Sequence, residues 1–158
     1  MIPGESCLPP LDFPALITSS NPEETFNLGK NLSTYLEKGS IIALNGPLGA
    51  GKTCFAKGIA KGLGVEEEVT SPTYTIVSEY CGFLPGQGQT RVTIFHIDAY
   101  RLNGEDDFSA IGGEEIIFGD GISIIEWSDH IPGFIPPGAF VVDIGICNDG
   151  KRIIRIAK

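Results

Sequence analysis

The stretch that most constrains this chain reads GPLGAGKT, from Gly46 to Thr53. It matches the pattern G-x-x-x-x-G-K-[ST]. The apolar run before it, residues 40–46, predicts a buried strand, and residues 52–64 carry apolar side chains at helical spacing. In a strand, glycine-rich turn and helix, backbone N–H groups and the positive end of the helix surround phosphate oxygens. We therefore expect this loop to bind a nucleoside triphosphate.

Two residues of this loop have distinct expected roles. Lys52 would reach the β- and γ-phosphates, and the hydroxyl of Thr53 would bind Mg²⁺. ATP is a better expectation than GTP because the chain has no N-K-x-D sequence of the kind that GTPases use to read guanine. The competing interpretation is a glycine-rich turn with a solvated lysine. The motif predicts the ligand and leaves the reaction open.

Two carboxylates follow apolar runs that predict further strands. Asp98 closes RVTIFHID, and Glu126 lies near the end of GISIIEW. A P-loop needs a carboxylate at the end of a neighbouring strand to hold Mg²⁺ and to orient the attacking nucleophile. We expect Glu126 to bind the metal as a Walker B acid, and Asp98 to bind it through water or to polarise water. A salt bridge for Glu126 and a turn cap for Asp98 are the structural alternatives.

Several other residues are weaker candidates. His96 is expected to be a structural histidine, because no third metal ligand lies near it in the sequence. Arg101 would either stabilise charge in a transition state or form a salt bridge. Trp127 is expected in the core or at an interface. Lys151 and Arg152, after the last turn, could reach the nucleotide.

The segment TSPTYT, residues 70–75, lies where P-loop proteins commonly place a loop that senses the γ-phosphate and magnesium. On this hypothesis Ser71 and Thr73 lie near the γ-phosphate, and Tyr74 faces the site mouth or a partner. The alternative is a strand entrance: the hydroxyls satisfy loop backbone groups and a strand runs from Thr73 to Tyr80. The two interpretations are compatible.

The remaining pattern predicts one α/β domain. A helix is expected from Pro22 to a stop at Gly39. Alternating strands on both sides of the glycine-rich loop 81–89 predict a hairpin, and residues 104–120 predict one or two short acidic helices. A second hairpin should turn at residues 148–150. We expect residues 1–20 to form an irregular N-terminal arm, either a tail or a strand-like arm laid over the domain, and residues 21–158 to form a single domain.

The charge balance excludes one class of function. A net charge of −9 and a pI near 4.6 repel phosphate backbones, whereas an autonomous nucleic-acid reader carries a basic surface. The four cysteines form no CxxC pair, which argues against zinc and fits a reducing compartment. The N-terminal stretch has no basic residue before Lys30, and no apolar run is long enough to span a bilayer. We expect a cytoplasmic protein that does not contact membranes.

Four motifs, GPLGAGKT, SPTYT, HIDAYRL and IIEWSD, follow one another at compact spacing. This ordered set resembles the TsaE family of bacterial tRNA threonylcarbamoyladenosine biosynthesis ATPases, from about Asn21 to Pro136. The resemblance implies an α/β, three-layer P-loop NTPase fold with a mixed, mainly parallel sheet and antiparallel flanking strands. It also implies weak ATP hydrolysis in support of TsaB and TsaD, which install threonylcarbamoyl on the tRNA adenosine beside the anticodon. A TsaE-like protein does not perform that transfer itself, and it would meet tRNA through its partners.

By position, the resemblance also assigns site residues. Thr53 and Glu126 would bind Mg²⁺, and Lys52 and Glu126 would form the catalytic cluster with Asp98. The expected nucleotide-binding residues are Gly46, Leu48, Gly49, Ala50, Gly51, Lys52, Thr53 and Cys54, with Pro22 and Gly150 near the nucleotide. Two departures from the family are Cys54, where a second threonine is common, and the Gly- and Pro-rich loop 81–89. Neither removes a charge or a metal ligand.

Two other functions remain open at the level of sequence. Small-molecule kinases share the strand, P-loop and helix arrangement, but they normally carry an arginine-bearing lid over the phosphates, and this chain has few arginines. A non-catalytic ATP-dependent binding switch would need the nucleotide only to order its loops.

Overall fold

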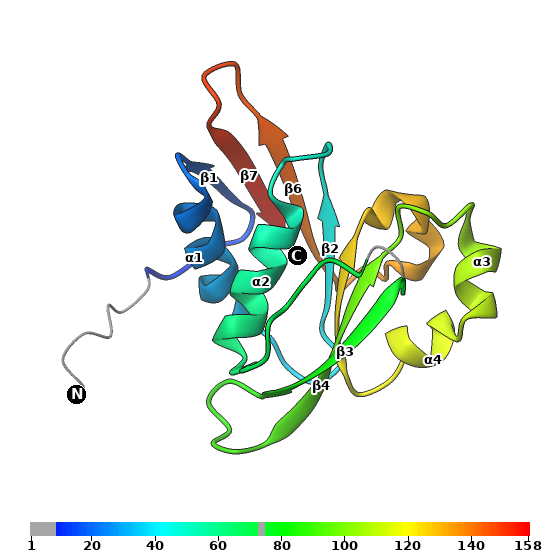
Figure 1. Cartoon of the computed structure of the whole chain (residues 1–158). Helices are drawn as coiled ribbons and strands as arrows, with labels where there is room; N and C mark the ends of the chain where they lie inside the picture. The colour runs from blue at the N-terminus through cyan, green and yellow to red at the C-terminus, as the bar shows by residue number, and fades with distance from the viewer. Residues whose placement is uncertain (1–8, 73–74) are drawn as a thin grey trace.

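The computed structural model describes residues 9–72 and 75–158, and the description below concerns those residues. A seven-stranded mixed sheet of order β1-β7-β6-β2-β5-β4-β3 lies between two layers of helices, as Figure 1 shows. The predicted three-layer α/β fold is therefore confirmed. The elements are β1 (Ala15–Ser19), α1 (Pro22–Ser33), β2 (Ile41–Asn45), α2 (Lys52–Gly62), β3 (Val77–Phe83), β4 (Arg91–Asp98), α3 (Glu105–Ala110), α4 (Gly113–Ile117), β5 (Ile122–Glu126), the 3-10 turns η1 (Ser128–His130) and η2 (Pro132–Phe134), β6 (Phe140–Ile146) and β7 (Arg152–Ala157).

The central strands β6, β2, β5 and β4 run parallel. The flanking strands β1, β7 and β3 pair antiparallel with their neighbours. A parallel strand covered on both faces reads as a continuous apolar run, and both β2 (IIALN) and β5 (ISIIE) do so. Because parallel strands end at the same edge, this topology gathers the ends of β2, β4 and β5 in one place.

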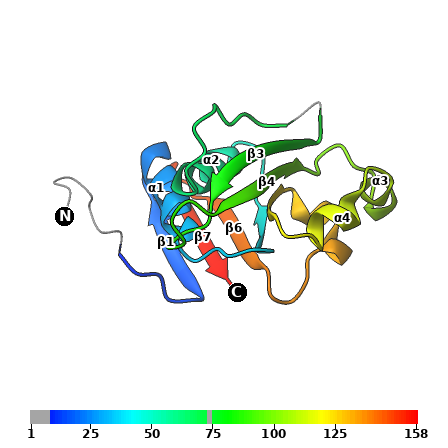
Figure 2. The same ribbon diagram turned by 90° about the horizontal axis from the view of Figure 1, so that it is seen from below.

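The two helical layers bury separate apolar clusters. Helices α1 and α2 pack together over one face of the sheet, where Leu32, Phe55 and Ile59 are fully buried. On the other side, Phe108 of α3 and Ile131 lie in a second cluster beneath β4 and β5. Figure 2 shows α3 and α4 far from α1, at the other end of the sheet. No helix among residues 9–72 and 75–158 has the length and apolar character needed to cross a membrane.

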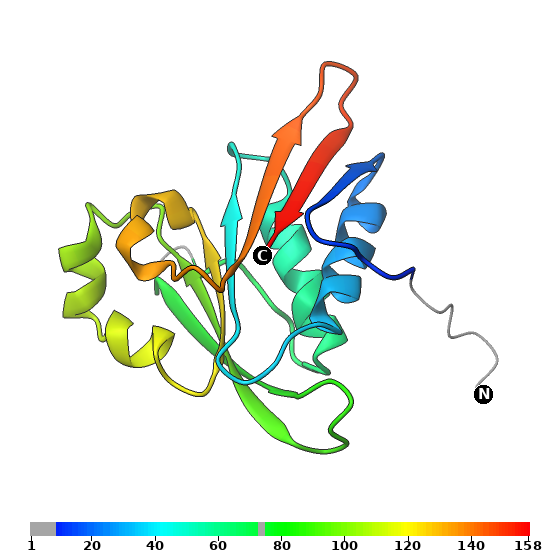
Figure 3. The ribbon, with the colours of Figure 1, turned by 180° about the vertical axis from the view of Figure 1, so that it is seen from behind.

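Of the two forms expected for the N-terminal arm, residues 15–19 take the strand-like one. Residues Ala15–Ser19 form β1, which pairs antiparallel with β7 from Ala15↔Ile156 to Ser19↔Arg152. Figure 3 shows β1 beside the hairpin of β6 and β7. A five-residue strand whose partner lies at the far end of the chain leaves little local signal, so its pairing could not be inferred from the N-terminal sequence. The edge of the sheet therefore includes part of the expected arm.

The expected extension of the first helix to Gly39 is wrong, since α1 ends at Ser33. The Ser33 hydroxyl donates to the Lys30 carbonyl at 2.6 Å, and the Thr34 hydroxyl donates to the Asn31 carbonyl at 2.8 Å. These bonds satisfy carbonyls that the next helical turn would otherwise use. Gly39 is instead a turn residue with φ of 82°.

The expected strand from Thr73 to Tyr80 begins later, at Val77, and continues through Phe83 into the region expected to be a loop. Ile76 has φ of 64°, a conformation that interrupts a strand. The antiparallel hairpin of β3 with β4 is confirmed. The acidic helices and the C-terminal hairpin of β6 with β7 are confirmed as well.

Candidate functional site

The P-loop joins the end of β2 to the start of α2, as the sequence predicts. Glycine is required at two of its positions. Gly51 has φ of 108°, which side chains rarely adopt, and a Cβ on Gly46 would come within 2.6 Å of the Ile144 carbonyl oxygen. The loop thus turns tightly against β6, and its next residues open the helix with backbone N–H groups that lack intrahelical acceptors.

Lys52 is buried, and its ammonium group lies within the loop. Nζ donates to the carbonyls of Gly46 at 2.6 Å and Pro47 at 2.9 Å, and it sits 3.9 Å from the centroid of the Trp127 ring. Burial lowers the pKa of Lys52 from its ordinary value, although nearby carboxylates, Glu126 first, oppose that shift. The lysine is therefore a charge held beside acidic groups at the phosphate loop.

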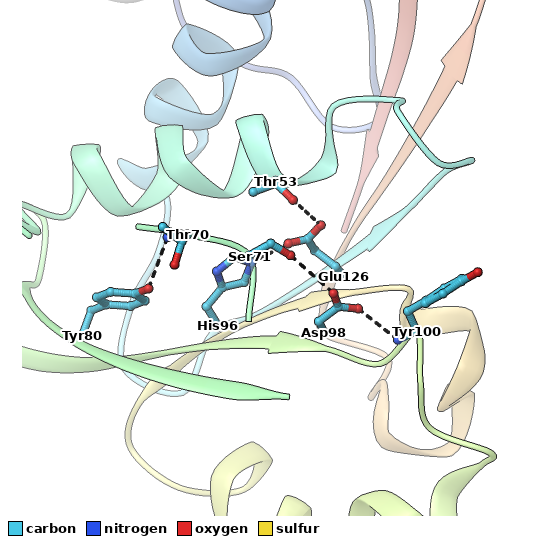
Figure 4. A network of polar contacts seen from close by, with 8 residues as sticks. All are labelled: Thr53, Thr70, Ser71, Tyr80, His96, Asp98, Tyr100 and Glu126. Carbon is cyan, nitrogen blue, oxygen red and sulfur yellow. Dashed lines mark hydrogen bonds and ion pairs between the residues drawn. The ribbon is translucent and has the colours of Figure 1, made fainter. Parts of the chain in front are cut away.

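The two predicted carboxylates meet at one edge of the sheet. Asp98 and Glu126 occupy paired positions at the ends of β4 and β5. The Thr53 hydroxyl donates to Oε1 of Glu126 at 2.8 Å, so the first turn of α2 touches the end of β5, as Figure 4 shows. The two residues expected to share a magnesium ion are thus in direct contact.

Asp98 has a capping contact and a site-facing contact. Its Oδ1 accepts the Tyr100 N–H at 3.0 Å, and its Oδ2 accepts the Ser71 hydroxyl at 3.4 Å. Asp98 therefore caps the turn at Tyr100 and also faces the site. Of the two expected sensor residues, Ser71 lies beside Asp98, whereas Thr73 lies outside the described residues.

These groups line one open pocket of about 370 Å³. Its lining comprises Leu48, Gly49, Gly51, Lys52, Thr53, Cys54, Ser71, Asp98, Tyr100, Glu126 and Trp127. Hydroxyl and carboxylate oxygens are hard ligands of the kind that Mg²⁺ prefers. Residues 9–72 and 75–158 hold no cluster of three or more His, Cys, Asp or Glu side chains fit for a metal. The Thr53 hydroxyl and the Glu126 carboxylate could hold a magnesium ion whose other ligands would be phosphate oxygens and water, as in phosphoryl-transfer sites.

A second pocket of about 180 Å³ adjoins the P-loop on its other side. Pro22 and Gly150, both expected near the nucleotide, line it together with Ala50 and Cys54. The sequence does not show that Pro22 and Gly150 lie close together. The pairing of β1 with β7 brings them to the same pocket. Of the two residues after the last turn, Arg152 lines this pocket and Lys151 does not.

Arg152 holds the P-loop from β7. Its Nε donates to the Ala50 carbonyl at 3.0 Å and its Nη2 to the Gly49 carbonyl at 3.1 Å. Nη1 donates to the carbonyl of Gly150 in the preceding turn. These bonds turn two loop carbonyls toward the guanidinium. Arg101, by contrast, lines neither this pocket nor the larger one.

Trp127 packs against the second core cluster and His96 is buried, as expected for structural residues, and both also contact residues of the site. Trp127, with φ of 59°, lies against Lys52, and its ring centroid is 4.9 Å from that of Tyr100. His96 is buried with Nε2 at 2.6 Å from Oε2 of Glu126. The position of Trp127 directly after Glu126 is the sequence signal that could have placed it at the site. The contact of His96 requires the register of two strands, which the sequence does not show.

Comparison with known proteins identifies similar chains. Residues 19–154 match the family model described as threonylcarbamoyl adenosine biosynthesis protein TsaE. A tRNA threonylcarbamoyladenosine biosynthesis protein TsaE of Treponema pallidum is 39% identical, with 88% of this chain and 97% of that protein covered. The protein of the same name from Bacillus subtilis is 38% identical over 85% of this chain and 79% of its own length. The crystal structure of Bacillus subtilis YdiB superposes with a TM-score of 0.70 at 32% identity, covering 90% of this chain and 83% of that one.

Proposed function

The chain belongs to the TsaE family, whose members are named for tRNA threonylcarbamoyladenosine biosynthesis, and we propose that it acts there by binding ATP with magnesium and hydrolysing it slowly. In this role it is an accessory subunit that works with TsaB and TsaD and does not transfer the threonylcarbamoyl group itself. Its place of action is the cytoplasm, where free cysteines persist. Cys54, Cys81 and Cys147 are free.

One observation carries the proposal: the Thr53 hydroxyl and the Glu126 carboxylate are 2.8 Å apart at the start of the helix that follows the P-loop. A serine or threonine of the P-loop and an acid at the end of a neighbouring strand are the protein ligands of Mg²⁺ in P-loop NTPases. Here the acid is Glu126 at the end of β5, the strand beside β2. The pair therefore supports a magnesium-dependent nucleotide site.

The other site residues have consistent roles. Lys52 exchanges its bonds to two loop carbonyls for the β- and γ-phosphates, and the backbone N–H groups at the start of α2 bind phosphate oxygens. Thr53 and Glu126 hold Mg²⁺, which when bound neutralises charge that develops on the phosphates. Asp98, paired with Glu126 at the sheet edge, orients the attacking water. Pro22 and Gly150 border the nucleoside from the pocket beside the loop.

The family role also explains why an acidic protein can serve a tRNA-modifying pathway. With a net charge of −9, the chain attracts no polyanion by long-range electrostatics. TsaB and TsaD therefore supply the tRNA contacts, and this subunit contributes its ATPase cycle.

The test separates binding, hydrolysis and assembly. ATP binding and phosphate release are measured for the wild type, Lys52→Ala and Glu126→Ala, and purified TsaB and TsaD are captured with and without ATP. We expect Lys52→Ala to lose binding, Glu126→Ala to lose phosphate release, and capture to depend on ATP. A wild type that neither binds ATP with Mg²⁺ nor associates with the partners contradicts the proposal.

Other outcomes favour the alternative functions. If assembly needs ATP and neither substitution changes phosphate release, the protein is a binding switch. A phosphorylated product in a metabolite screen indicates a kinase.

A further inference from the structure

His96 lies behind the carboxylate that the proposed function assigns to magnesium. It projects from β4 with a side chain only 1% exposed, and its Nε2 is 2.6 Å from Oε2 of Glu126. Figure 4 shows the His96 ring beside the Glu126 side chain. The other oxygen, Oε1, accepts the Thr53 hydroxyl at 2.8 Å. Each oxygen of this carboxylate therefore has one protein partner, and the two partners come from different elements.

The second ring nitrogen of His96 indicates which proton the histidine carries. Nδ1 is buried and has no hydrogen-bond partner within the described part of the chain. A buried N–H without an acceptor is rarer than a buried acceptor without a donor. The hydrogen-bond pattern therefore assigns the proton to Nε2, which donates it to Glu126.

This donation holds Oε2 of the Glu126 carboxylate, whose other oxygen is held by Thr53. Glu126 is 3% exposed, so water does little to orient its carboxylate. Mg²⁺ demands near-ideal octahedral geometry, and a ligand that is already oriented loses less entropy when the ion binds. Partners behind a metal ligand typically change metal affinity by about 10- to 100-fold when they are removed.

We propose that His96 is a positioning residue for magnesium: its Nε2–H fixes Oε2 of Glu126 so that Oε1 and the Thr53 hydroxyl together face the ion. This inference rests on the proposed function and deepens it. The competing role is purely structural, in which the ring fills space and satisfies a buried carboxylate without effect on the metal.

Three substitutions separate these roles. The amide nitrogen of His96→Gln can occupy the position of Nε2, because it lies the same number of bonds from Cβ. His96→Asn is shorter by one methylene and reaches only the position of Nδ1. His96→Leu keeps bulk and removes every donor. The matched control is Ser123→Ala, which removes the other buried side-chain polar atom without a partner in the described chain.

The readout is the affinity of Mn²⁺, used in place of Mg²⁺, for the protein with a non-hydrolysable ATP analogue, followed by electron paramagnetic resonance. We expect His96→Asn and His96→Leu to weaken Mn²⁺ binding by about 10- to 100-fold. His96→Gln should recover most of the affinity, and Ser123→Ala should bind like the wild type. Circular dichroism checks the fold of each variant, and if His96→Leu unfolds, the Gln and Asn pair carries the comparison.

Two results overturn the inference and leave the proposed function standing. Equal Mn²⁺ affinity in the wild type and His96→Asn would show that His96 does not position the ligand. A glutamine variant as weak as the asparagine variant would show that ring volume matters and the Nε2 donor does not. A wild type that binds no Mn²⁺ with the analogue instead rejects the proposed function, and the positioning role with it.

Discussion

At the scale of single residues, the site concentrates opposite charges around Lys52. Its ammonium group is held by two loop carbonyls and the Trp127 ring, close to Glu126 and Asp98. A buried charge is tolerated when it is paired and hydrogen-bonded. On the proposed function, phosphate oxygens would replace these partners of Lys52 without creating an unpaired charge.

Lys52→Met should strongly weaken ATP binding and leave the fold intact. Methionine keeps the apolar stem against Trp127 and removes the charge that would bind phosphate. Hydrogen bonds to charged groups are worth about 1.5–3 kcal/mol, so the affinity should fall by about 10- to 100-fold. Calorimetric titration with ATP and Mg²⁺ measures this, with Lys57→Met, an exposed lysine of the same helix, as the control. A folded variant with the ATP affinity of the wild type would contradict the assignment.

The lowered pKa of Lys52 predicts a pH dependence of stability. Between its folded pKa and the ordinary value of 10.5, this lysine binds fewer protons in the folded than in the unfolded state. The free energy of unfolding therefore rises with pH across that interval. Urea unfolding of wild type and Lys52→Met between about pH 8 and pH 10 should show the wild type gaining relative to the variant as pH rises. If the difference in unfolding free energy between wild type and variant stays constant or falls as pH rises, the pKa of Lys52 is not lowered.

At the scale of elements, the P-loop is held by its neighbours as well as by its own sequence. The guanidinium of Arg152 on β7 reaches the carbonyls of Gly49 and Ala50. On the other side, α2 packs tightly against α1. These two contacts position the loop, and each can be tested.

Arg152→Ala should weaken ATP binding by about tenfold, about 1.4 kcal/mol, because two loop carbonyls lose their shared donor. Arg152→Lys should restore little, since one ammonium cannot reproduce the forked geometry of the guanidinium. Arg155→Ala, on the same strand, is the control, because Arg155 contacts Asp143 and not the loop. Equal ATP affinity in the Arg152 and Arg155 variants would exclude the positioning role.

Gly58→Ala should destabilise the fold by about 1–3 kcal/mol, the usual effect of overpacking. A Cβ at Gly58 of α2 would overlap the carbonyl oxygen of Phe26 in α1, and neither backbone can move freely. Gly138→Ala is the control, because no atom lies within 4 Å of a Cβ there. Thermal denaturation measures both, and equal melting temperatures would show that the helices can separate without cost.

Elements with strong local signals could be predicted, and those fixed by distant partners could not. GPLGAGKT and the acids ending two apolar runs gave the P-loop, Asp98 and Glu126 at one sheet edge. The strand Ala15–Ser19 depends on a partner near the other end of the chain. The positive φ of Ile76 delays the start of β3, and isoleucine is not a residue type that predicts such a conformation. The contacts of His96 and Arg152 follow from strand register and hairpin pairing, which local patterns do not encode.

At the scale of the whole molecule, the charge sets what the protein can bind alone. We expect no complex with unmodified tRNA at physiological salt up to about 100 µM, the weak end of non-specific affinities. The reason is the net charge of −9. Electrophoretic mobility shift measures this for the protein alone and for its mixture with TsaB and TsaD, where a shift is expected. A shift with the protein alone would require a basic surface that the overall charge does not suggest.

The pairing of β1 with β7 has a consequence for how the protein is made. Domains begin to fold during synthesis from the N-terminal side, yet the partner of Ala15–Ser19 is Arg152–Ile156. The first strand cannot pair until residues 152–156 have left the ribosome, and the guanidinium that binds the carbonyls of Gly49 and Ala50 belongs to the same segment. A chain released before Arg152 is translated has an unpaired edge and an unanchored P-loop. On the proposed function, full affinity for the nucleotide would therefore develop only after β7 has been synthesised.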